Sequence, residues 1–147
     1  VLELGIHTLQ NEYLTQAREF RGVRLEHVPV DGVSGLLTAC ADPQKPDFEG
    51  AVASDAVSCA EYDLCLGCSQ SRVFDVHLPR IAKRILQYEE FRLEMSREIW
   101  DIEYGRKFAR AHDVLAGWKD RQTVETAWEA AKNGDVRLPK IIFRGGA

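Results

Sequence analysis

The chain has 147 residues, of which 45% are hydrophobic and 29% are charged, and its formal net charge is −4. This length predicts one domain, or one domain and a fragment, with enough residues to bury a core. No apolar run approaches the roughly 20 residues of a membrane-spanning helix, and Val1–Ile6 lacks the features of a signal peptide. We therefore expect a cytoplasmic protein with no membrane partner.

The first part of the chain, residues 1–38, predicts a helix followed by extended chain. Apolar residues recur at helical spacing from Ile6 to Phe20, with Thr8 as a candidate N-cap and Gly22 as a candidate stop. Val23–Val30 then alternates loosely, and turn residues follow. Because the chain starts without methionine and in the middle of a segment, we expect it to be part of a longer protein.

Residues 39–75 predict an irregular loop organised by four cysteines. Cys40, Cys59, Cys65 and Cys68 follow the pattern C-x18-C-x5-C-x2-C. Four thiolates form a standard tetrahedral zinc site, and a metal would hold together a loop that has no regular period. Three alternatives stay open: disulfides, buried reduced thiols, and an iron–sulfur cluster held by the same four thiolates.

His77 lies nine residues after Cys68 and could replace one sulfur ligand. A histidine at this place is more often part of a helix start.

Residues 76–147 predict long amphipathic helices. An apolar stripe begins at Leu78 and includes Met95, Ile99 and Ile102, and a second stripe runs from Phe108 to Trp118. A continuous helix of this length would be about 60 Å long. We therefore expect a break or kink between Met95 and Gly105. The two parts then form a hairpin or a bundle.

A third helix is predicted from Asp120, its N-cap, to Asn133-Gly134, its end. The apolar tail Leu138–Phe143 is expected to dock in extended form on this domain or on a neighbour. Trp100, Trp118 and Trp128 are expected in the core. The predicted fold class is mainly α: an N-terminal helix, a four-cysteine metal-binding loop, and long helices.

The charge is divided unevenly along the chain. Residues 1–75 carry 12 acidic and 5 basic side chains, whereas residues 76–147 carry 11 acidic and 14 basic ones. The basic residues of the helices could line a surface that faces phosphate: Arg80, Lys83, Arg84, Arg97, Arg106, Lys107 and Arg110. Acidic residues interleave with them, so salt bridging along the helices is the explanation that we prefer.

The segment Ile6–Leu14 resembles the region around the nucleophile of tyrosine recombinases, the phage integrase family. The resemblance implies that the hydroxyl of Tyr13 attacks a DNA phosphodiester and forms a 3′-phosphotyrosyl bond. Family members supply two arginines, a lysine or histidine, and a second histidine to the phosphate. Here Leu4-Gly5 is not followed directly by histidine, and no arginine motif precedes Tyr13. The chain alone therefore lacks groups that catalysis needs.

The cysteine loop adds to this resemblance, because some integrase-like proteins of mobile elements carry a C-x2-C tail and long helices after the tyrosine. The first hypothesis is the C-terminal part of a recombinase that acts on DNA and self-associates. The second is a non-catalytic, zinc-stabilised helical module that binds protein or nucleic acid. The third is an iron–sulfur protein.

Overall fold

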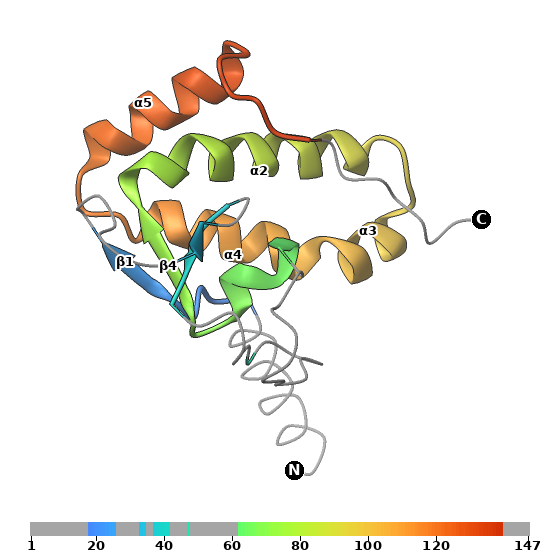
Figure 1. Cartoon of the computed structure of the whole chain (residues 1–147). Helices are drawn as coiled ribbons and strands as arrows, with labels where there is room; N and C mark the ends of the chain where they lie inside the picture. The colour runs from blue at the N-terminus through green and yellow to red at the C-terminus, as the bar shows by residue number, and fades with distance from the viewer. Residues whose placement is uncertain (1–17, 26–32, 35–36, 42–46, 48–61, 140–147) are drawn as a thin grey trace, which may run out of the picture.

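The computed structural model describes residues 18–25, 33–34, 37–41, 47 and 62–139, and this part of the chain is mostly helical (Figure 1). The predicted helical class is therefore confirmed in its coarse form. The predicted N-terminal helix lies almost entirely outside the described residues. Arg18 lies in a turn and Glu19 in a bend, and the amide of Phe20 donates to Asp113 Oδ2 at 2.8 Å, so no helix extends to the predicted stop at Gly22.

Four helices form the back half of the chain: α2 (Leu78–Arg92), α3 (Arg97–Glu103), α4 (Gly105–Ala116) and α5 (Arg121–Lys132). The predicted break between Met95 and Gly105 is confirmed. Ser96 caps α3, because its hydroxyl accepts the amide of Ile99 at 3.4 Å. A helix can restart there because the cap satisfies a backbone N–H that has no partner inside the helix.

The predicted bounds of the third helix are also confirmed. The carboxylate of Asp120 accepts the amide of Gln122 at 3.1 Å, which caps α5. Asn133 ends the helix, and Gly134 follows with a φ of 78°, a conformation that favours glycine.

A small sheet, which the sequence did not predict as such, packs beside the helices. It contains β1 (Val23–Leu25), β2 (Val33–Ser34), β3 (Ala39–Cys40) and β4 (Ser71–Phe74), in the order β1-β4-β3-β2. β1 runs parallel to β4, and the other two pairs are antiparallel. Two 3₁₀ turns flank β4: η1 (Tyr62–Gly67) and η2 (Asp75–His77).

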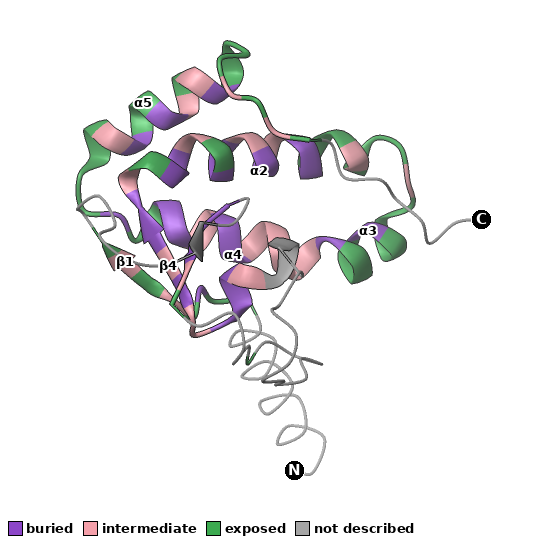
Figure 2. Ribbon diagram, in the orientation of Figure 1, coloured by how far each residue is buried: buried purple, intermediate pink, exposed green. Residues whose placement is uncertain are grey.

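The main core lies where α2, α4, α5 and the sheet meet, and Figure 2 shows the buried faces of these elements turned toward one another. Leu78, Ile81, Ile85, Val73 and Val114 are completely buried. Burial of each such side chain contributes about 1.5–3 kcal/mol relative to exposure. α2 is therefore the element around which the other helices pack.

A second cluster joins α3 to α2 and α4. Tyr88, Trp100 and Tyr104 are buried in it, and the indole N–H of Trp100 donates to the carbonyl of Tyr88 at 2.7 Å. Trp118 is buried in the main core, so two of the three predicted core tryptophans are confirmed. Trp128 is only half-buried.

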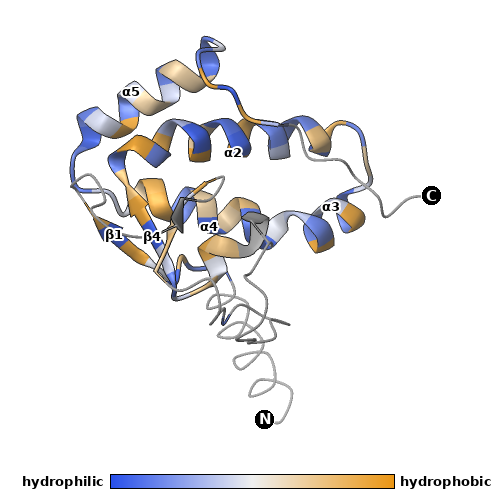
Figure 3. Cartoon of the chain, viewed as in Figure 1, coloured by the Kyte–Doolittle hydropathy of each residue, from blue (hydrophilic) through white to orange (hydrophobic). Residues whose placement is uncertain are grey.

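The helical stripe was wrong for Ile99 and Ile102, which are 43% and 80% exposed. α3 is mostly exposed in Figure 2 although it carries hydrophobic residues in Figure 3. The turn at residues 93–96 changes the direction of the chain, so the phase of α2 does not continue into α3. α3 buries Trp100 instead.

Two of the cations predicted on a phosphate-facing surface are buried: Arg84 is 1% exposed and Arg110 is 7% exposed. Arg84 donates to Gln87 Oε1 and to the carbonyl of Pro139, while Gln87 donates to the carbonyl of Leu138. These contacts hold residues 138 and 139 against α2, which agrees with the expected docking of the tail; its residues from 140 onward lie outside the described part.

No helix in the described part of the chain is both long and apolar enough to cross a membrane.

The buried His77 marks the entry to α2. Its Nδ1 accepts the amide of Phe74 at 3.0 Å, so the imidazole is neutral at that nitrogen. Burial lowers the pKa of His77, the charge of Arg80 lowers it further, and Asp75 opposes the change. Burial likewise lowers the pKa of His112 on α4.

These two histidines predict a loss of stability in mild acid. A histidine whose pKa is lowered in the folded state is protonated more readily in the unfolded chain. Its contribution to the free energy of unfolding is therefore complete above about pH 6.5 and declines below that pH. His77→Asn removes the titration and keeps an acceptor group. We expect it to reduce the slope of unfolding free energy against pH between about 5.5 and 6.5 by up to ~1.4 kcal/mol per pH unit. Urea unfolding at several pH values measures this slope, and an unchanged slope would contradict the prediction.

Candidate metal centre

Cys65 and Cys68 are brought together by a tight turn at the end of η1. The amide of Cys68 donates to the carbonyl of Cys65 at 2.9 Å, and the amide and hydroxyl of Ser71 donate to the carbonyl of Cys68 at 3.2 and 2.9 Å. Cys68 is 5% exposed and Cys65 is half-buried. The C-x2-C spacing thus forms a local, hydrogen-bonded turn that carries two thiols.

Cys40 approaches the same region on a neighbouring strand. The register of β3 and β4 pairs Cys40 with Ser71, and the amide of Ala41 donates to the carbonyl of Gln70 at 2.9 Å. Cys40 therefore lies opposite the strand that leaves the turn, although 25 positions separate it from Cys65 in the sequence. Whether its thiol belongs to the same group as Cys65 and Cys68 stays a prediction from the spacing.

Asp47 connects the turn to the chain before it. Its amide donates to Cys68 Sγ at 3.3 Å, and its carboxylate accepts the amide of Ser69 at 2.7 Å and the hydroxyl of the same residue. Burial raises the pKa of Asp47, but the hydrogen bonds from Ser69 and Cys68 and the charge of Arg21 outweigh it, so the pKa is lowered. The sequence analysis missed Asp47, whose only local signal is a position after Pro46.

Two arginines place positive charge beside the turn. Arg21 Nη1 donates to the carbonyls of Gly67 and Asp47 at 2.9 and 3.0 Å. The buried guanidinium of Arg110, on α4, lies against Gly67: a Cβ at that glycine would stand 2.3 Å from its Nη1.

The remaining predicted site residues divide into two groups. Cys59 and Tyr13 lie outside the described residues. His77 takes part in the start of α2, and its Nδ1 is occupied by the Phe74 amide. Among the described residues, no disulfide links Cys40, Cys65 and Cys68 to one another. Within the described ranges, no three histidine, cysteine or acidic side chains form a group that could hold a metal.

Around the Cys65–Cys68 turn, the described residues thus show one sulfur that accepts a backbone amide and two guanidinium groups that contact Gly67. Comparisons with models of known families, with curated proteins and with solved structures gave no match. The interpretation of the site therefore depends on its own geometry.

The contact between Gly67 and Arg110 generates a testable pair of variants. Gly67→Ala would place a methyl group against the guanidinium of Arg110, which would have to shift although the residue is only 7% exposed. We expect the free energy of unfolding to fall by about 1–3 kcal/mol. At Gly105 a Cβ would meet nothing closer than 4.0 Å. The control Gly105→Ala, at the start of α4, should be neutral or stabilising by about 0.4–1 kcal/mol. Equal effects in denaturant unfolding would contradict the close packing described.

Proposed function

We propose that this chain is a helical module stabilised by one zinc ion, and that Cys40, Cys59, Cys65 and Cys68 are its ligands. The observation that carries the proposal is the amide of Asp47 donating to Cys68 Sγ in the Cys65–Cys68 turn. Such a bond orients a sulfur ligand and stabilises its negative charge. When bound, zinc would link the Cys65–Cys68 turn to the strand that carries Cys40.

An iron–sulfur cluster on the same four thiolates is the alternative to zinc. It differs in a visible property, because such clusters absorb broadly in the visible range and zinc does not.

The test of the metal proposal is elemental analysis of the reduced, purified chain, with its visible absorbance recorded on the same sample. We expect one zinc per chain and no colour. Cys65→Ser and Cys68→Ser should each lower zinc occupancy and the unfolding temperature, as should Cys40→Ser and Cys59→Ser. Gln70→Ala, in the same turn but without a sulfur, is the control and should retain the metal. A folded, metal-free chain would overturn the proposal, and a coloured, iron-containing chain would replace zinc with a cluster.

We also propose that the module follows the nucleophile segment of a tyrosine recombinase-like protein. The supporting observation is the Ile6–Leu14 segment with Tyr13, in the expected order before the cysteines. In this reaction the phenolic oxygen of Tyr13 would form a bond to phosphorus while the bond to the 5′-oxygen breaks. The 5′-hydroxyl would leave with a proton, and the phosphotyrosine would conserve the energy of the broken bond. DNA and a second protomer would be partners of the longer protein.

The recombinase proposal is tested in a longer protein that includes the arginine motifs upstream. Tyr13→Phe should abolish covalent attachment to DNA, detected as a protein–DNA adduct that survives denaturation, without changing the unfolding temperature. Tyr62→Phe, outside the resembling segment, should leave the adduct unchanged. An adduct that persists in Tyr13→Phe would rule out the role of this tyrosine as nucleophile.

A further inference from the structure

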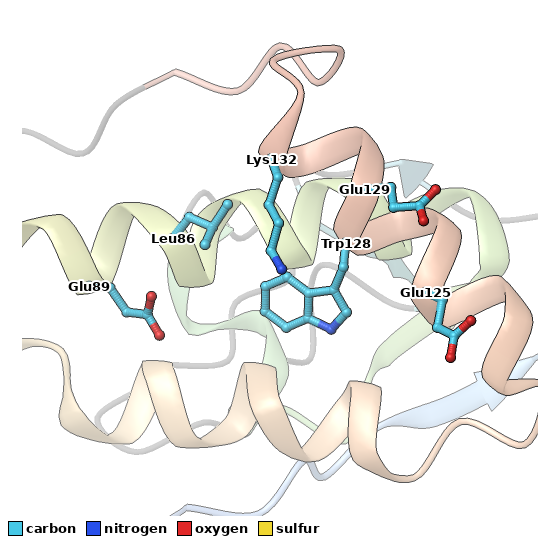
Figure 4. A pocket seen from close by; sticks show the side chains of 6 residues that line it. All are labelled: Leu86, Glu89, Glu125, Trp128, Glu129 and Lys132. Atoms are coloured by element: carbon cyan, nitrogen blue, oxygen red, sulfur yellow. The ribbon is translucent and has the colours of Figure 1, made fainter.

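A groove of about 500 Å³ lies between α2 and α5 (Figure 4). Leu86 and Glu89 line it from α2, and Glu125, Trp128, Glu129 and Lys132 line it from α5. None of these residues belongs to the cysteine-bearing segments, so the groove is independent of the proposed metal centre. Its lining combines one aromatic side chain, one aliphatic side chain and four charges.

The groove has a negative charge that its own residues do not neutralise. In the described part of the chain, none of Glu89, Glu125 and Glu129 lies in an ion pair within 4 Å. All three are exposed. The cation among the lining residues is Lys132, which extends toward the indole of Trp128 rather than toward a carboxylate (Figure 4). The field in the groove therefore favours a positively charged group.

Trp128 provides the second, independent indication of a ligand. Its ring is half-buried, and the centroid of the ring lies 6.1 Å from the centroid of the His112 ring and 5.9 Å from Lys132 Nζ. The latter distance is at the outer limit of a cation–π contact. Lys132 is therefore only weakly attracted to the ring. Among the described residues, no acceptor lies within hydrogen-bond distance of the indole N–H. The tryptophan thus offers a π face and a donor at the same groove.

We propose that this groove binds a peptide segment of a partner protein through one arginine or lysine side chain that is followed by an apolar residue. The cationic group stacks on Trp128 and lies among the three carboxylates, in place of Lys132. The apolar neighbour contacts Leu86, and a peptide carbonyl accepts the indole N–H. Charge complementarity selects this occupant, because phosphate groups of a nucleic acid would be repelled by the same carboxylates.

The probe is a short blocked peptide that contains one arginine followed by isoleucine, titrated into the full 147-residue chain. Its matched control contains citrulline, the neutral isostere of arginine. The readout is the NMR resonance of the Trp128 indole N–H, assigned from a Trp128→Phe variant. We expect a saturable shift with the arginine peptide and an affinity at least about fivefold weaker with citrulline.

Charge-matched variants separate the groove from the general charge of the protein. The triple variant Glu89→Gln, Glu125→Gln and Glu129→Gln should weaken binding about fivefold or more. The control Glu90→Gln, Glu98→Gln and Glu103→Gln removes the same charge from exposed positions that do not line the groove, and should weaken it less than about twofold. Lys132→Met removes the competing cation and should strengthen binding, whereas Lys119→Met should not.

Three results would overturn the proposal. They are equal affinity for the arginine and citrulline peptides, equal weakening by the two triple variants, and no shift of the Trp128 resonance at millimolar peptide. A shift of that resonance with protein concentration alone, together with dimerisation in sedimentation, would assign the groove to a second copy of the chain and would also overturn it. The glutamate and lysine variants replace exposed side chains, Trp128→Phe replaces a half-buried one, and circular dichroism verifies that each is folded.

Discussion

Polar side chains of α4 hold Phe20, β1 and the turn at Gly67 in place. Asp113 accepts the amide of Phe20, and Arg24 from β1 donates to the carbonyls of Asp113 and Val114 at 2.7 and 3.3 Å. Arg24 thereby adds a donor to two carbonyls near the end of α4, of which that of Asp113 also accepts the amide of Gly117 at 3.0 Å. Arg110, on the preceding turn of the same helix, packs on Gly67. Residues on two successive turns of α4 therefore contact the chain on the N-terminal side of α2. β1 has no fully buried side chain, so its position depends on these contacts.

The sequence predicted the helices well because their signals are local. Ser96, Asp120 and the Asn133-Gly134 pair each fix a boundary through hydrogen bonds or backbone conformation within a few residues. The sheet was missed because its decisive pairing is not local: Val23 aligns with Arg72, and each strand is only two to four residues long. Such short strands have no measurable alternation of their own.

The sequence-based prediction was also wrong about two charged side chains that are buried. Arg84 and Arg110 lie on helices at spacings that also suit a solvated face, so periodicity alone could not place them in the interior. What identifies them is the tertiary contact: the tail carbonyl of Pro139 for one and the approach of Gly67 for the other. The candidate site shows the same division. The spacing of Cys65 and Cys68 indicates their shared turn, whereas the positions of Cys40 and Asp47 beside that turn depend on strand pairing and on a hydrogen bond between residues distant in the sequence.

The burial of these two arginines affects which kind of partner the helices can bind. With Arg84 and Arg110 buried, part of the positive charge of the back half stabilises the fold and is withdrawn from any surface that could contact phosphate. The exposed glutamates between α2 and α5 face solvent without ion pairs in the described structure, and they would repel a nucleic acid. Of the two partners open to a non-catalytic module, protein therefore fits this face better than nucleic acid. A longer recombinase-like protein would contact DNA through surfaces other than the α2–α5 groove.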